Sequence, residues 1–176
     1  RVAIAHPELS FSMIHGSSEL FDLPAGKLKQ RLIHVFGNKI EDKLVPVEEN
    51  TSVSAINGFV LKPEAAKRSR GMQFFIVNRR FVKSSFLHHA ICTAYDGLLN
   101  DGSYPGYFLF FDLAPDTIDI NIHPTKTEVK FENEQSLFAI LRSAVKHSLG
   151  MFQVTPTLDF DRDPNLDVPY QQVDQS

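Results

Sequence analysis

Apolar and polar residues alternate along several short segments of the chain, which is the pattern of a strand with one buried face. We expect such strands over residues 8–14, 19–23, 43–49, 52–61, 118–123 and 128–131, and a further strand over the mainly apolar residues 107–113. Residues 72–77 are instead a short, mainly apolar run, typical of a strand buried on both faces. The Gly/Ser turn between the first two segments predicts a hairpin, and Gly58 marks a bulge or a close approach of two backbones.

Apolar residues at helical spacing predict helices over residues 27–36, 84–99 and 133–150, the second with a serine N-cap and the third ending at Gly150. The last two are long enough to cover one face of a sheet. The order of elements therefore predicts an α+β fold, with a mixed β-sheet backed by two long helices.

These elements divide the chain into three parts. Residues 1–24 form the hairpin region, residues 25–150 the α+β domain, and residues 151–176 a linker or tail, because periodicity stops there and Pro and Asp accumulate. Arg1 stands in a strand-like pattern instead of an initiating Met, so we expect a fragment of a longer protein. Residues 63–71 have the composition of a basic, mobile loop.

The composition fits one sizeable core, since 43% of the 176 residues are hydrophobic. The single Cys92 cannot form an internal disulfide; we expect a buried small side chain without a base beside it. No apolar run approaches the roughly 18 to 20 residues of a membrane span. We therefore expect no membrane partner.

The net charge of −3 is unevenly distributed. Residues 151–176 contain five Asp and one Arg, a net charge of −4, so residues 1–150 carry +1. Basic residues are concentrated in one segment with Glu64 as its single acid: Lys62, Lys67, Arg68, Arg70, Arg79, Arg80 and Lys83. Guanidinium and ammonium groups in this segment could bind backbone phosphates, or could simply form surface ion pairs.

Other candidate sites are weak. The adjacent His88 and His89 point in different directions on a helix and, with His123, do not complete a zinc-like ligand set, so we predict no metal site. Asp119 and His123 could be imagined with Glu128 as an acid/base set, but no nucleophile accompanies them, and we predict no catalytic residue. The chain also lacks a Gly-rich phosphate-binding loop.

The most informative stretch is Asp119–Phe131. Pro124 ends its first strand, so Lys126 is expected at the tip of a stiff turn between two strands. A lysine there could reach a phosphate oxygen on a neighbouring group, although a solvated surface lysine is the plain alternative.

Residues Asn121–Phe131 resemble the signature of MutL-type DNA mismatch repair proteins, a pattern of Asn-x-His-Pro-x-Lys-x-Glu-Val. A second segment, Phe75–Val82, is similar to that family's strand-ending pattern, with Arg79 at a position that is frequently Gly. The resemblance implies a transducer domain with the fold of ribosomal protein S5 domain 2. It also implies that Lys126 contacts the terminal phosphate of ATP bound in a neighbouring ATPase domain, and that Asn121, His123 and Pro124 support the turn.

The resemblance further implies DNA contacts from the basic segment, at Lys67, Arg68, Arg70, Arg79, Arg80 and Lys83. The implied partners are the protein's own ATPase domain, DNA, a MutS-type mismatch recognition protein and a second copy of the full-length protein, in the cytoplasm of a bacterium near its nucleoid. ATP and magnesium would be bound by the full-length protein. For residues 1–176 alone, the resemblance implies no cofactor and no enzymatic activity. One alternative is a stand-alone nucleic-acid-binding module of S5-like fold. Another is the transducer domain of a gyrase-type enzyme, but the Asn-x-His-Pro turn argues against that one.

Overall fold

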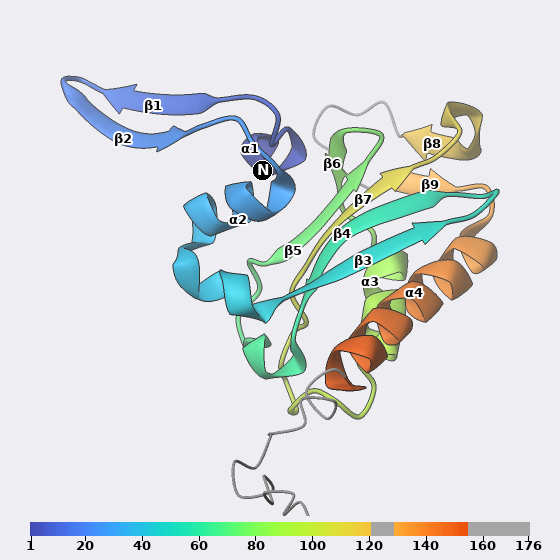
Figure 1. Ribbon diagram of the computed structural model, residues 1–176. Helices are drawn as coiled ribbons and strands as arrows, with labels where there is room; N and C mark the ends of the chain where they lie inside the picture. The colour runs from blue at the N-terminus through green and yellow to red at the C-terminus, as the bar shows by residue number, and fades with distance from the viewer. Residues whose placement is uncertain (121–128, 155–176) are drawn as a thin grey trace, which may run out of the picture.

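The computed structural model describes residues 1–120 and 129–154 and is built on a five-stranded mixed sheet (Figure 1). The strands run in the order β3 (Leu44–Asn50), β4 (Ala55–Leu61), β7 (Tyr107–Asp112), β5 (Gln73–Val77) and β6 (Arg80–Val82). All neighbours are antiparallel except β5 and β7, which are parallel. The predicted α+β class with a mixed sheet is confirmed.

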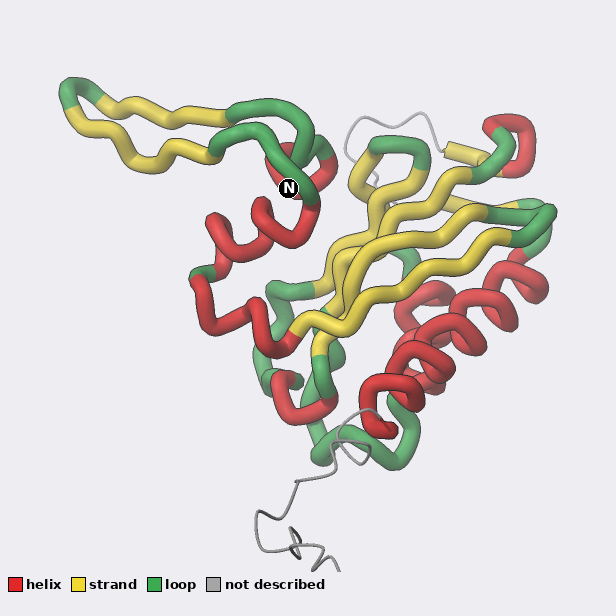
Figure 2. Tube along the Cα trace, in the orientation of Figure 1, coloured by secondary structure: helices red, strands yellow, loops and turns green. Residues whose placement is uncertain are grey.

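The larger core lies between the sheet and the two helices α3 (Ser85–Ala94) and α4 (Glu134–Val154), as Figure 2 shows. A small ladder of β8 (Ile118–Ile120) and β9 (Val129–Phe131) closes one end of this core. Leu87 and Ile91 of α3 and Leu141 and Val145 of α4 are fully buried, which confirms that the apolar faces of these helices cover the sheet.

A second core on the opposite face of the sheet was not predicted. The helices α1 (Val2–Ala5) and α2 (Leu28–Phe36) and the 3-10 helix η1 (Asn38–Lys43) cover part of that face. Phe108 of β7 stacks with Phe74 at 5.4 Å between ring centroids and also contacts Phe36 of α2 at 5.3 Å. The many phenylalanines thus serve both faces, so both helix layers are needed to bury them.

The hairpin of β1 (Phe11–His15) and β2 (Ser18–Leu23) is confirmed and extends away from the rest of the domain (Figure 1). Within it, Leu23 alone is buried. The residues before it, expected to be strand-like, form the short helix α1 instead. Alternation over five residues could not distinguish the two structures, and burial of Ile4 and Ala5 against α2 favours the helix.

Several boundaries also differ from the prediction. The Ser84 hydroxyl accepts a hydrogen bond from the Leu87 amide at 3.1 Å and caps α3, but this helix ends at Ala94, before Gly97 at φ 74°. The helix α4 continues past Gly150 to Val154, because an interior Gly costs only about 1 kcal/mol.

Residues 63–71, expected to be a mobile loop, contain the 3-10 helix η2 (Pro63–Ala65) with Ala65 buried. The backbone of Lys67 is bonded to Tyr104 by two hydrogen bonds, from Lys67 N to Tyr104 O at 3.3 Å and from Tyr104 N to Lys67 O at 2.8 Å. A third 3-10 helix, η3 (Pro115–Thr117), precedes β8.

At Gly58 the predicted close approach is confirmed. A Cβ there would lie 2.1 Å from the Phe108 carbonyl oxygen, so a side chain has no space between β4 and β7. Within the described residues, no helix is long and apolar enough to cross a membrane.

Candidate functional site

The β8–β9 ladder holds both ends of the segment that carries the sequence signature. Its pairs are Ile118↔Phe131, Asp119↔Lys130 and Ile120↔Val129. Val129 and Phe131 are buried in the larger core, which fixes the ladder to the sheet and helices. The predicted site residues Asn121, His123, Pro124 and Lys126 fall in residues 121–128, outside the described residues. The chain therefore leaves and rejoins the described structure at one paired position, Ile120 and Val129.

The turn between β5 and β6 is a two-residue hairpin loop. Val77 pairs with Arg80, and the two residues between them, Asn78 and Arg79, have φ values of 47° and 69°. Positive φ at both positions is the geometry of a type I′ turn, which follows the twist of the flanking strands. Asn tolerates this conformation, whereas an arginine there is strained relative to glycine.

The side chain of Asn78 fastens this turn to the end of β7. Its Nδ2 donates to the Leu113 carbonyl at 2.9 Å, and its Oδ1 accepts from the Leu113 amide at 2.9 Å. The Asn78 amide also donates to the Phe111 carbonyl at 2.9 Å. The chain continues from Leu113 through η3 to β8. The turn is therefore bonded to the end of β7 from which the chain leads to the β8–β9 ladder.

Arg79 is held by the segment that precedes the hairpin. Its guanidinium forms an ion pair with the Glu8 carboxylate, and the His6 Nδ1 lies 3.4 Å from the same carboxylate oxygen. A hydrogen bond from the backbone of Glu8 lowers the pKa of its carboxyl, with smaller contributions from His6 and Arg79. Arg79 is thus engaged with a carboxylate, while Arg80 next to it is exposed and without an ion pair among the described residues.

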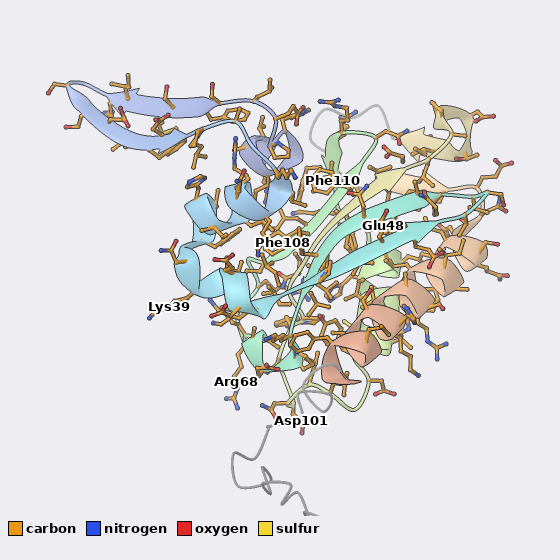
Figure 3. All side chains as sticks on the ribbon, in the orientation of Figure 1. Lys39, Glu48, Arg68, Asp101, Phe108 and Phe110 are labelled. Atoms are coloured by element: carbon orange, nitrogen blue, oxygen red, sulfur yellow. The ribbon has the colours of Figure 1, made fainter. Side chains whose placement is uncertain are left out.

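The basic residues predicted to act together lie at two ends of the sheet. Arg79 and Arg80 follow the end of β5, whereas Arg70 precedes its beginning, and the four residue steps of β5 span about 13 Å. Figure 3 shows Arg68 at the end of the molecule opposite the β5–β6 turn, on the same side as Asp101. Lys67, Arg68 and Arg70 therefore form one group, here called the lower basic group, separate from Arg79 and Arg80. Lys83 follows β6 and is exposed.

Arg31 was not among the predicted site residues, yet it is only 1% exposed. Its guanidinium donates to the carbonyls of Ala3 (2.9 Å), Pro7 (3.2 Å), Leu9 and Pro24 (3.0 Å) and lies over the Phe11 ring. These carbonyls belong to the chain entering and leaving the hairpin, so one side chain of α2 clamps both. Its position three residues after Leu28 on the apolar face of α2 was the available signal.

The prediction for Cys92 was partly wrong, because the residue is half-buried instead of buried and a histidine lies beside it. The Cys92 Sγ lies 3.5 Å from the Nε2 of His88, one helical turn earlier, and the His88 Nδ1 lies 2.9 Å from the Tyr107 hydroxyl. Burial raises the pKa of the Cys92 thiol and lowers the pKa of His88, so both groups are favoured in their neutral forms. The portions of the chain that the structure describes contain no cluster of three or more metal-ligating side chains.

Comparison with known proteins matches residues 32–150 to the family model described as "DNA mismatch repair protein, C-terminal domain". The chain is 60% identical over 174 residues to the DNA mismatch repair protein MutL of Flavobacterium johnsoniae, and 45% identical over 169 residues to that of Bacteroides fragilis. These alignments cover 99% and 96% of this chain but 27% of each relative, so the chain spans about a quarter of their length.

A solved structure described as "Crystal Structure of N terminal domain of a DNA repair protein" shares the fold, with a TM-score of 0.72 and 20% sequence identity. The match covers 88% of this chain and 52% of that one. The family match extends from the middle of α2 to the last turn of α4, and thus includes the β5–β6 turn and the β8–β9 ladder. The chain belongs to the MutL family of DNA mismatch repair proteins.

Proposed function

We propose that this chain is the transducer domain of a MutL-type mismatch repair ATPase. In this proposal Lys126 binds the terminal phosphate of ATP held, with magnesium, by a preceding domain of the same protein. The observation that carries it is the Asn-x-His-Pro-x-Lys-x-Glu-Val signature at residues 121–129 of a family member, attached to the core at the paired Ile120 and Val129. The chain alone would hydrolyse no nucleotide.

The energy available from one lysine suits a sensor. A charge-assisted hydrogen bond contributes about 1.5–3 kcal/mol, enough to shift an interdomain equilibrium by tenfold or more. An enzyme must lower its barrier by about 8 kcal/mol or more, which one such bond cannot supply. Lys126 would therefore report whether the terminal phosphate is present and couple that state to closure of a dimer.

The arrangement of the N-terminal residues supports a neighbouring domain at this end. The Arg1 guanidinium lies 4.7 Å from the centre of the Phe81 ring in β6, so the chain enters beside the β5–β6 turn. The hairpin carries exposed apolar side chains, among them Ile14 at 67% and Leu20 at 59% exposure. Residues 1–24 would then be the seam with the ATPase domain and residues 25–150 the transducer, with the linker beginning after Val154, the end of α4, instead of at residue 151.

DNA binding by the basic residues is the second part of the proposal. Arg80 and Lys83 are exposed and available to phosphates, whereas Arg79 must first leave Glu8. Neutralising Glu8 by Glu8→Gln in the full-length protein should therefore strengthen duplex binding and steepen its salt dependence, by about 0.9 in log–log slope for each additional phosphate that is bound. Glu19→Gln, an exposed carboxylate on β2, is the matched control. Unchanged binding in Glu8→Gln would remove Arg79 from the DNA surface.

The remaining parts of the proposal follow from family membership: a MutS-type recognition protein and a second copy as partners, in the bacterial cytoplasm with the nucleoid. ATP turnover by the full-length protein tests the central part. Lys126→Ala should reduce turnover at least tenfold, whereas Lys130→Ala, which removes an exposed lysine of β9, should not. Equal turnover in both variants would favour the alternative, a stand-alone nucleic-acid-binding module.

A further inference from the structure

A cavity of about 220 Å³ lies beside the lower basic group. Apolar side chains line part of it, including Phe36, Leu61 and Met72, and Lys67, Arg70 and Tyr104 line another part. Small-molecule sites usually measure about 300–1,000 Å³, so this cavity has room for one large side chain of a peptide better than for a whole ligand.

The polar wall of the cavity is fixed in place. The Arg70 guanidinium lies 4.8 Å from the centre of the Tyr104 ring, and the backbone bonds between Lys67 and Tyr104 hold the two sides together. The Gln73 side chain accepts from the Gly71 amide at 2.9 Å and donates to the Pro105 carbonyl at 2.9 Å. The Arg70 guanidinium and the backbone of Lys67 thus stand at defined positions at the rim.

The cations at this rim have no carboxylate partner in the described part of the chain. Within residues 1–120 and 129–154, no salt bridge involves Lys67, Arg68 or Arg70. The cavity therefore combines an apolar floor with an uncompensated positive rim. Its complement is an aromatic side chain flanked by acidic residues.

The chain itself contains that pattern just beyond α4. Phe160 stands between Asp159 and Asp161, within the segment of net charge −4 that follows Gly150. The end of α4 lies close to the cavity, because the Lys62 Nζ is 4.2 Å from the centre of the Phe152 ring and Lys62 immediately precedes η2. The helix α4 ends at Val154, and the six residue steps from Val154 to Phe160 span at most about 20–22 Å, which is ample for this short path.

We propose that the segment Leu158–Arg162 of this chain docks in the cavity, with Phe160 on the apolar floor and Asp159 and Asp161 at Lys67 and Arg70. Docking would cover the lower basic group and hold it away from nucleic acid. This consequence for DNA rests on the proposed function, whereas the docking itself does not.

The docking is tested with a synthetic peptide of residues 155–165. In a calorimetric titration, the peptide is added to full-length protein that carries D159N, F160S and D161N. These substitutions remove the protein's own docking side chains, so the cavity is free for the peptide. A tethered segment has an effective concentration of about 1 mM, so we expect saturable binding with a dissociation constant below about 1 mM. Adding Lys67→Gln and Arg70→Gln should weaken binding about tenfold or more, whereas Lys39→Gln and Lys43→Gln, the same charge loss on η1, should not.

A dissociation constant well above 1 mM would overturn the proposal. So would equal weakening of peptide binding by both double substitutions, because that result indicates a general effect of charge. Binding of oligodeoxythymidine that requires Lys67 and Arg70, in the absence of peptide binding, would assign the cavity to nucleic acid instead. Because the peptide assay involves neither ATP nor DNA, its outcome is independent of whether the proposed function holds.

Discussion

The side chain of Asn78 and the backbone of Leu113 are joined by a reciprocal pair of hydrogen bonds, both 2.9 Å long. These bonds connect the turn after β5 to the strand end that leads, through η3, to the β8–β9 ladder. The β5–β6 turn, which belongs to one segment that resembles the mismatch repair signatures, is therefore bonded to the chain that leads to the ladder flanking the other segment.

Asn78→Ala should lower the free energy of unfolding by about 2–4 kcal/mol, because it removes two hydrogen bonds and places alanine at positive φ. Asn78→Gly loses the same bonds without the backbone strain, so it should be about 1 kcal/mol less damaging. Urea unfolding of both variants measures the difference. Equal stability of the two variants would show that the positive φ at this position carries no cost.

Arg79→Gly should leave the melting temperature unchanged or raise it by about 2–4 °C. Glycine relieves the left-handed conformation at φ 69°, and the ion pair with Glu8 that is lost is exposed and contributes at most about 1 kcal/mol. Differential scanning calorimetry makes the measurement, with Arg80→Gly as the control at a β6 position where glycine has no advantage. A fall in melting temperature for Arg79→Gly would mean that the Glu8 contact outweighs the strain.

Arg31→Met should release the N-terminal segment, because it leaves four carbonyls without their donor at a cost of about 1–3 kcal/mol for each that stays buried. Amide hydrogen exchange should become faster in α1 and the hairpin by a factor of 100 or more, on the order of 3 kcal/mol, with a smaller change in β4 and β7. Arg31→Lys should recover only part of the protection, since an ammonium lacks the planar fork of donors.

Lys29→Met is the matched control for Arg31, because Lys29 lies on the same helix in an exposed pair with Glu41 and should contribute at most about 1 kcal/mol. If the hairpin amides of Arg31→Met exchange as slowly as those of the wild type, Arg31 does not act as a clamp.

Acidification should destabilise the fold through His88. Burial lowers the pKa of His88, so the unfolded chain binds the proton more readily, and stability falls as the pH drops below about 6.5. The groups around His88 are Arg70, His89, Cys92 and Tyr107. Chemical unfolding at pH 7.5 and 5.5 should show a smaller loss in His88→Gln than in the wild type, and His34→Gln on α2 should retain the wild-type loss. Identical losses in all three proteins would exclude His88 as the source.

The sequence predicted the elements with long or strict periodicity. The apolar run in Tyr107–Asp112 and the helical spacing in Glu134–Val154 indicated strand β7 and helix α4, and the Asn-Arg dipeptide after an apolar run indicated the β5–β6 turn. These signals are clear because burial is uniform along each element: both faces of β7 are buried, and α4 buries one face along most of its length.

Other features depend on distant partners and left no local pattern. The helix α1 has four residues, too few to show a period, and its burial requires α2. Leu98 and Leu99 continued the apolar spacing of α3, although the chain turns at Gly97 and Leu99 packs against the larger core from outside the helix. The lower basic group separates from Arg79 and Arg80 because β5 stands between them, which composition alone could not reveal. The role of Lys126 remains a prediction from resemblance.

The affinity of the full-length protein for nucleotides, with and without the terminal phosphate, tests the central claim most directly. Lys126→Ala should raise the dissociation constant of a non-hydrolysable ATP analogue by about tenfold or more, because a bond of about 1.5–3 kcal/mol is lost, and should leave ADP binding within about twofold. Lys130→Ala should change neither. Equal effects of Lys126→Ala on both nucleotides, or no effect on the ATP analogue, would contradict the account.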